Sequence, residues 1–177
     1  MRLLQIAAVV SAVLVATTPA RADKTADFFR QSGVTIVVGF VVGGGYDVYA
    51  RLLGRHMGRH IPGNPTIIIR NMPGAGSMAA ANYIYNNAPK DGSTIGTFSR
   101  SIPTQPLFDR QGVQFDALKF NWIGSPASEV SVIFSPKSNG FKSLDDLRSR
   151  PMRVPASGLG ADSAIYPFVT NAILARS

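Results

Sequence analysis

The sequence predicts an α/β fold with a mostly parallel sheet, because strand-like runs alternate with glycine-containing loops and helical patterns. Residues 34–40 (VTIVVGF) and 66–69 (TIII) are short β-branched runs, and residues 93–98 (STIGTF) follow the turn Lys90-Asp91-Gly92. A helical pattern separates each run from the next. Two strands joined through a helix lie parallel in one sheet, so we expect the chain to build β-α-β units.

The predicted helices follow from apolar spacing and stop signals. In residues 46–60, apolar and basic side chains occupy different sides of a helix: Val48, Tyr49, Leu52, Leu53 and Met57 on one, Arg51, Arg55 and Arg59 on another. The run Pro62-Gly63-Asn64-Pro65 ends this helix. A second helix is predicted around residues 79–84, and a last one over residues 162–175. Residues 143–146 resemble a capping box that opens a short helix, and further strands are expected at 121–124, 129–134 and 152–156.

The first 22 residues have the three parts of a secretory signal peptide. Met1-Arg2 is a short positive start, residues 3–16 are almost wholly apolar, and Ala20-Arg21-Ala22 fits an A-x-A cleavage site. The apolar run is too short for a membrane span, which needs about 20 residues. The sequence therefore predicts cleavage after Ala22 and export to the periplasm.

Composition excludes several classes of function. Hydrophobic residues make up 45% of the chain and charged residues 16%, as in globular proteins. The chain has no cysteine, which rules out thiol catalysis and thiolate metal sites. Loss of Arg2 and Arg21 with the leader would lower the net charge from +8 to +6. The arginine side of residues 46–60 has no aromatic interleaving, so nucleic-acid binding is not expected.

The glycine triplet Gly43-Gly44-Gly45 follows a predicted strand and precedes a predicted helix. It does not match the P-loop motif, which needs Lys where Gly45 stands. It does not match the dinucleotide motif either, which needs glycine where Val48 stands. Glycine backbone and the donors of a helix N-terminus can still bind a carboxylate, phosphate or sulfate. A tight strand-to-helix turn explains the triplet equally well, and Asp47 is either a helix cap or a ligand contact.

Similar loops recur along the chain. Residues 43–47, 74–77 and 157–163 each combine small residues with the start of a predicted helix. In a parallel sheet such loops lie at the carboxyl edge, where open α/β sheets bind ligands. Arg100 follows a predicted strand and could pair with a carboxylate there, although a solvated loop arginine is an equal alternative.

Catalytic and metal motifs are not met. His56 and His60 have i, i+4 spacing, but the Glu of H-E-x-x-H is missing and a solvated helix end explains them better than a metal site. Ser77 and Ser157 lack the flanking glycines of a nucleophile elbow. We therefore expect no catalytic residues, no metal and no cofactor.

The motifs together resemble the receptor family of tripartite tricarboxylate transporters, the Bug-type periplasmic solute-binding proteins. The resemblance runs from about Val34 to the C-terminus and is carried by residues 43–47 (GGGYD) with 50–51 (AR), 71–77 (NMPGAGS), 88–92 (APKDG), 115–116 (FD) and 156–158 (ASG). The family commonly has a basic residue where Met72 stands and glycine where Ser77 stands.

This resemblance implies a two-lobed periplasmic-binding fold of type II, a Venus flytrap that traps a small carboxylated solute between its lobes. Residues 23–124 would form the first lobe, and residues 125–177 the start of a second lobe that is incomplete because family members run to about 300 residues. The implied partners are the solute and, transiently, membrane transporter subunits, with the receptor itself a monomer. The implied ligand-binding residues are Gly43, Gly44, Gly45, Tyr46, Asp47, Gly74, Ala75, Gly76, Ser77, Ser99, Arg100, Ser101, Ser157, Gly158, Asp162 and Ser163.

Two other interpretations remain open from the sequence. One is an exported hydrolase that uses Ser157 or the two histidines. The other is a truncated product without function, because half a cleft cannot close on a solute.

Overall fold

The computed structural model describes residues 23–108, 111–128 and 130–174, so the predicted signal peptide lies outside the described residues. Its core is a three-stranded sheet in the order β2-β1-β3, with β1 at Val34–Val38, β2 at Ile67–Asn71 and β3 at Thr94–Thr97. Both pairings of β1 are parallel, and Ile36 lies opposite Ile69 on one side and Ile95 on the other. The predicted α/β architecture with a parallel sheet is confirmed.

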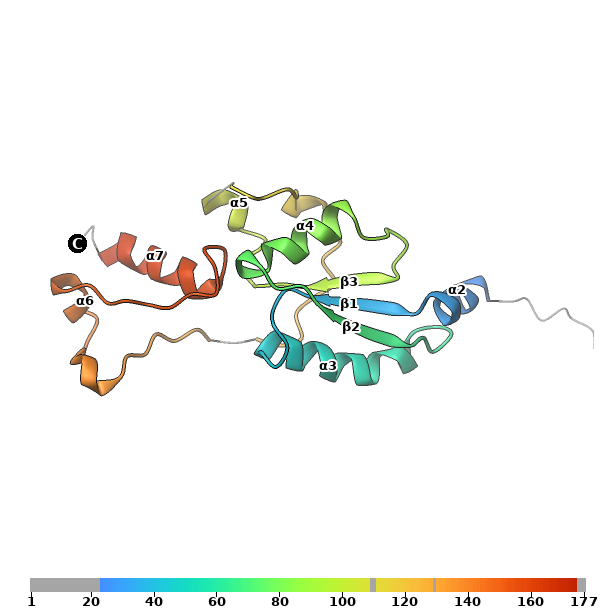
Figure 1. Ribbon diagram of the computed structural model, residues 1–177, viewed down its shortest axis with the longest axis horizontal. Helices are drawn as coiled ribbons and strands as arrows, with labels where there is room; N and C mark the ends of the chain where they lie inside the picture. Colours follow the sequence, from blue (N-terminus) through green and yellow to red (C-terminus); the bar gives the residue numbers. More distant parts are fainter. Residues whose placement is uncertain (1–22, 109–110, 129, 175–177) are drawn as a thin grey trace, which may run out of the picture.

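Two helices cover opposite faces of this sheet (Figure 1). Helix α3, Gly45–Met57, connects β1 to β2, and α4, Met78–Asn86, connects β2 to β3. Because β2 and β3 lie on opposite sides of β1, right-handed crossovers place the two connecting helices on opposite faces. Strand β1 is buried along almost its whole length as a result.

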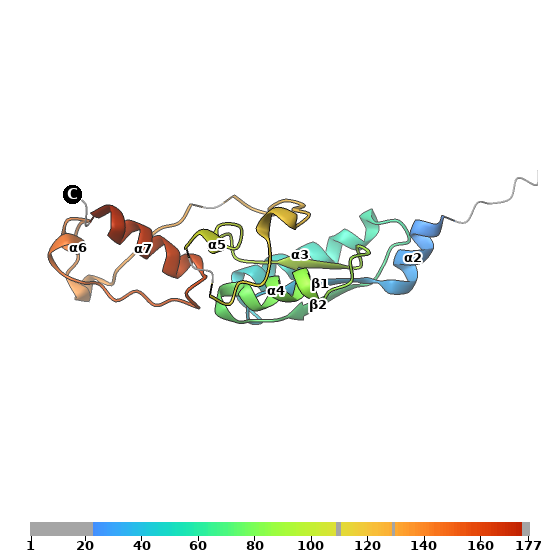
Figure 2. The same cartoon turned by 90° about the horizontal axis from the view of Figure 1, so that it is seen from above.

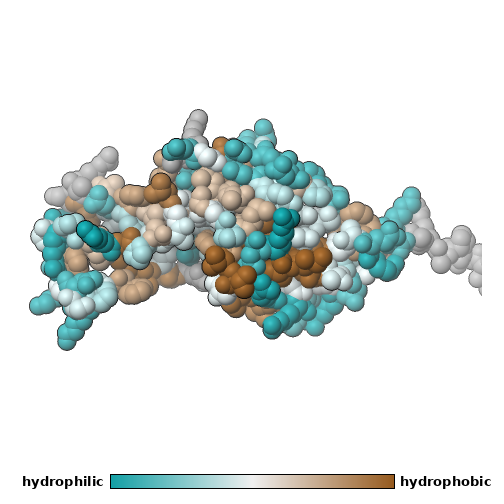
Figure 3. Space-filling view, viewed as in Figure 1, coloured by the Kyte–Doolittle hydropathy of each residue, from teal (hydrophilic) through white to brown (hydrophobic). Residues whose placement is uncertain are grey.

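Helix α3 meets the sheet with its small residues. Asp47 and Ala50 are its buried positions, and a Cβ at Gly54 would lie 3.1 Å from Ile69 Cδ1. Of the apolar side predicted for this helix, Met57 packs against the core. The other four of those side chains are exposed, Leu52 to 51%, and they form apolar surface over α3 (Figure 3).

The remaining elements are short or lie at the ends. Helix α2, Lys24–Ser32, precedes β1 and is capped by the Asp23 side chain. After β3 come α5 (Gln105–Phe108), α6 (Asp146–Ser149) and α7 (Asp162–Leu174), with short 3-10 turns at Gly58–His60, Ala75–Ser77, Ala117–Lys119 and Lys137–Asn139. Figure 2 shows the sheet and its helices at one end of an elongated molecule, and α6 and α7 at the other. In the described part of the chain no helix is long and apolar enough to cross a bilayer.

The prediction of strands after residue 120 is wrong for the described residues. Residues 121–124, 130–134 and 152–156 form no strand. A strand needs a neighbour for its backbone N–H and C=O groups, and the sheet ends at β2 and β3. Val130 and Phe134 are accordingly 91% and 85% exposed. Half of the capping box predicted at residues 143–146 is present: Asp146 Oδ2 accepts a hydrogen bond from the Ser143 N–H at 2.9 Å.

Candidate ligand-binding site

The candidate site lies at the carboxyl edge of the sheet, where the connections of the chain diverge. From β1 the chain turns through α3 to β2 on one side, whereas β3 lies on the other side of β1. Such a switch in direction leaves a crevice beyond the carboxyl ends of the strands, and open α/β sheets bind their ligands there. The predicted loops 43–47 and 74–77, and the predicted site residues 99–101, all follow strands that end at this edge (Figure 1).

The glycine triplet forms an open turn into α3. Gly43 has a φ of +85°, in the left-handed region that favours glycine. No atom lies within 4 Å of the position that a Cβ would take on Gly43 or Gly45. Gly44 is the N-cap of α3 and supplies no side chain to its first turn. The backbone of this turn is therefore uncovered at a helix N-terminus.

Asp47 lies beneath the turn with only 1% of its surface exposed. Its carboxylate accepts hydrogen bonds, each 2.8 Å long, from Arg51 Nε, Asn71 Nδ2 and the Gly43 N–H. The bond from Arg51, followed by those from Gly43 and Asn71, holds the pKa of Asp47 far below its ordinary value. Asp47 thus fastens the glycine turn to the first turn of α3, although no side chain caps this helix, and its direct contact with a ligand stays a prediction.

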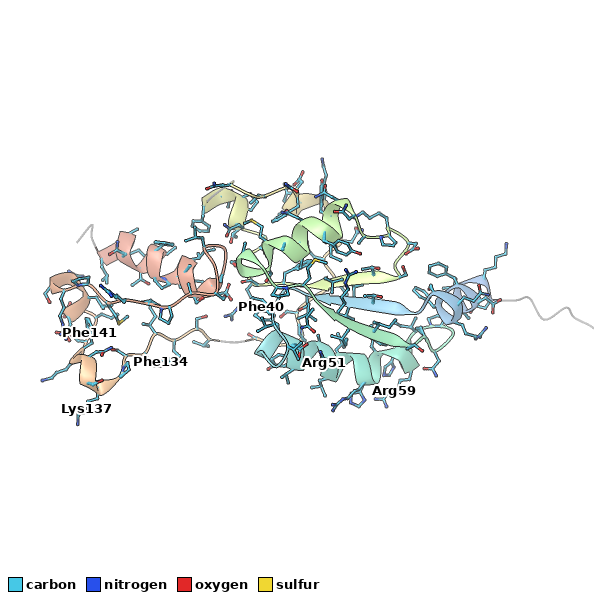
Figure 4. The ribbon with its side chains drawn as sticks, in the orientation of Figure 1. Phe40, Arg51, Arg59, Phe134, Lys137 and Phe141 are labelled. Carbon is cyan, nitrogen blue, oxygen red and sulfur yellow. The ribbon has the colours of Figure 1, made fainter. Side chains whose placement is uncertain are left out.

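Asn71 links this carboxylate to the end of β1. Its Nδ2 also donates to the Phe40 carbonyl at 3.0 Å, and its Oδ1 accepts from Arg51 Nη2 at 3.2 Å. In Figure 4, Phe40 and Arg51 lie at the end of the sheet that faces α7, while Arg59 lies in the 3-10 turn beyond the far end of α3. The Phe40 ring stacks on Tyr46, with centroids 4.3 Å apart.

The second loop enters α4 through an unusual backbone. Ala75, Gly76 and Ser77 have φ values of +46°, +66° and +79°. The Ser77 side chain is buried, and its Oγ accepts the Ser99 N–H at 2.9 Å. Ser77 thus has a left-handed backbone conformation, which glycine adopts without strain.

A carboxylate of the chain itself occupies the crevice between the loops. Asp162, the first residue of α7, accepts a hydrogen bond from Ser99 Oγ at 2.9 Å on Oδ1. On Oδ2 it accepts from Arg100 Nε at 3.1 Å and from the Tyr46 hydroxyl at 3.4 Å. Burial, and next the charge of Asp162, raise the pKa of Tyr46, so its hydroxyl stays a donor at neutral pH. Three predicted site residues thus surround the carboxylate of a fourth.

The loop before α7 rests on the second loop without intervening side chains. A Cβ on Gly158 would lie 2.6 Å from the Gly76 nitrogen, and one on Gly76 would lie 2.4 Å from the Ala161 nitrogen. Ser101, which is buried, donates from Oγ to the Gly160 carbonyl. The structure therefore brings loops 74–77, 99–101 and 158–162 together.

Ser157 and Ser163 lie apart from this set of contacts. Ser157 is exposed, and its N–H donates to Ser163 Oγ at 3.4 Å. Their role toward a ligand stays a prediction. Within residues 23–108, 111–128 and 130–174, no group of three or more His, Asp or Glu side chains could hold a metal ion.

Sequence reasoning missed residues that hold the site together. Arg51 stands four residues after Asp47, and this i, i+4 spacing of opposite charges was a usable signal. Asn71 and Gln105 gave no such signal, because their partners come from distant parts of the chain. Gln105 is buried against Gly160 and lines a cavity of about 260 Å³ with Ala75, Met78, Gln111, Gly112 and Leu159.

Comparison with known proteins gives two curated relatives. A UPF0065 protein in the gbd 5′ region of Cupriavidus necator is 30% identical over 142 residues, which are 80% of this chain and 41% of that protein. A UPF0065 protein in the tcbD–tcbE intergenic region of Pseudomonas sp. strain P51 is 27% identical over 169 residues, 93% of this chain and 48% of that protein.

The chain therefore spans less than half the length of each relative. No family model and no solved structure matches it. The chain is a distant homologue, over most of its length, of these UPF0065 proteins, and its motifs resemble those of the Bug-type receptor family.

Proposed function

We propose that this protein is an extracytoplasmic receptor that captures a small carboxylated solute for a tripartite tricarboxylate-type secondary transporter. The observation that carries the proposal is the carboxylate of Asp162, held by Tyr46, Ser99 and Arg100 at the carboxyl edge of the sheet. Two hydroxyls and a guanidinium form charge-assisted hydrogen bonds that suit a carboxylate. Homology to a family of binding proteins favours capture over catalysis.

In this proposal, residues 23–124 are the first lobe of a type II periplasmic-binding fold and residue 125 begins the second. The open turn at Gly43–Gly45 adds uncovered backbone at the N-terminus of α3 to the first wall of the cleft. Closure of the second lobe excludes water, and the closed form docks on membrane subunits. The signal peptide at residues 1–22 delivers the protein, as a monomer, to the periplasm.

Calorimetry tests the proposal with the full chain and a panel of di- and tricarboxylates, each paired with its neutral amide. We expect binding of at least one carboxylate and none of its amide. Arg100→Gln should weaken that binding by about 10- to 100-fold, because a charge-assisted bond to the solute is lost.

The matched control is Arg55→Gln, which removes the same charge from the exposed side of α3, away from the crevice. It should leave the affinity unchanged. Binding of a sugar or a metal ion, with failure of every carboxylate, would contradict the proposed function.

A further inference from the structure

We propose that Asp162 is an internal competitor for the site: its carboxylate takes the position of the solute carboxylate, and a solute must displace it to bind. The inference rests on the proposed function and adds how the site selects its solute. A neutral molecule would bind the two hydroxyls and the guanidinium more weakly than the Asp162 carboxylate does. The site would therefore admit only anions able to replace a carboxylate that is already bound.

The first support is the geometry of the carboxylate itself. Both Asp162 oxygens are used, Oδ1 by Ser99 and Oδ2 by Arg100 and Tyr46. The Asp162 side chain is 16% exposed, so the solvent reaches it at the edge of the crevice. A second carboxylate cannot share the same donors, because like charges at that distance repel strongly. Occupation by the solute and by Asp162 are mutually exclusive.

The second support is a cost built into the docked loop. Gln105 is 2% exposed, and its Oε1 has no hydrogen-bond partner among the described residues. The oxygen faces Gly160, 3.3 Å from the position of a Cβ on that residue. A buried carbonyl without a donor is unfavourable, and this one lies against the docked loop. The contact between Gln105 and Gly160 forms when Asp162 docks, and its free-energy cost therefore opposes docking.

The third support is the chain that carries Asp162 to the crevice. Described residues 121–128 and 130–157 contain no strand, and their only helical elements are the short turn Lys137–Asn139 and α6. A carboxylate attached through such a segment competes at an effective concentration of the order of millimolar. A solute competes successfully when the ratio of its concentration to its own Kd exceeds the ratio of this effective concentration to the Kd of the untethered Asp162 carboxylate.

The test compares wild-type protein with Asp162→Asn by calorimetry, with succinate and citrate as probes. Asparagine keeps the shape of the side chain and removes the competing charge. We expect the Kd for a carboxylate to tighten by about tenfold, because the fraction of open sites rises. Hydrogen exchange at residues 158–161 should become faster in the variant without any solute.

The control is Asp145→Asn, which removes the same charge from the same segment. The Asp145 side chain is 89% exposed. Its affinity and exchange should equal those of wild type. Asp162→Glu keeps the charge but displaces the carboxylate, so it should tighten binding as well. This second variant serves if the asparagine variant proves unfolded by circular dichroism.

The outcomes separate the two proposals. If wild type binds a carboxylate and both Asp162 variants bind it equally or more weakly, the competitor is overturned and the proposed function stands. If succinate, citrate and the wider carboxylate panel bind neither wild type nor the variants, the proposed function is overturned, and the competitor falls with it.

Discussion

A buried carboxylate shapes the glycine turn at the level of single residues. The Gly43 N–H, Arg51 and Asn71 all bind to Asp47, so one side chain ties together the turn, the helix and the end of β2. Glycine backbone has a large conformational entropy to lose on ordering. The fixed carboxylate offsets part of this loss and keeps the turn in one conformation before any ligand arrives.

The pKa of Asp47 makes this contact testable by pH. Its hydrogen bonds lower the pKa in the folded state below the ordinary value of 3.8. The stabilisation is therefore present at neutral pH and is lost as the pH falls below about 4 toward the folded pKa. Asp47→Asn should lower the Tm by about 5 °C or more at pH 7, and the difference from wild type should shrink at pH 3, as measured by calorimetric melting.

Asp27→Asn is the matched control, because Asp27 is another first-turn aspartate paired with an arginine but is exposed. Exposed pairs of this kind contribute little to stability, so its Tm should stay close to that of wild type at both pH values. An equal loss of Tm in the two variants at pH 7 would show that burial of the Asp47 cluster has no special role.

Helix α3 illustrates, at the level of elements, what periodicity can predict. The helix itself and its end near Pro62 were predicted correctly, since Gly45–Met57 is followed by a 3-10 turn to His60. The face of the helix that packs on the sheet was predicted wrongly, because the small residues Ala50 and Gly54 let the helix approach the sheet closely. Apolar spacing alone locates large side chains, and here most of those are on the outside.

The contact between loops 74–77 and 158–161 carries the next prediction. Gly76→Ala places a Cβ 2.4 Å from the Ala161 nitrogen, on a residue whose φ is +66°. We expect a destabilisation of about 2–4 kcal/mol by denaturant unfolding, the sum of left-handed strain and overpacking. Faster hydrogen exchange at residues 158–161 should accompany it, because the loop can no longer dock.

Gly43→Ala separates the two costs. Gly43 also has a positive φ, +85°, but its Cβ would meet no atom within 4 Å. This variant should lose only about 1–2 kcal/mol, the strain of the left-handed conformation. Equal losses in the two variants would contradict a close contact between the loops.

The first hundred residues and the later ones differ in what the sequence could predict. Strands β1, β2 and β3, and their parallel order, followed from β-branched runs separated by helices. The same reasoning failed for residues 130–134, where a suitable run has no strand beside it. Local preference can propose a strand, but only a partner supplies its hydrogen bonds.

At the scale of the whole molecule, the protection of backbone amides from hydrogen exchange should therefore differ between the sheet and the later residues. Strand β1 is paired on both sides and covered on both faces, whereas residues 130–134 are exposed and no described strand pairs with them. Mass-spectrometric hydrogen exchange should find β1 amides at least about 1,000-fold slower than those of residues 130–134. Uniformly fast exchange would instead favour the interpretation of a truncated product that does not fold.

The order β2-β1-β3 leaves each outer strand with one row of backbone groups that no described strand pairs. Such rows are templates for another strand, whether it comes from the same chain or from a neighbouring molecule. The excess of basic over acidic residues keeps neighbouring molecules apart. Since 1 M salt shortens the range of that repulsion to about 3 Å, the colloidal behaviour of this protein depends on ionic strength through the two open sides of its sheet.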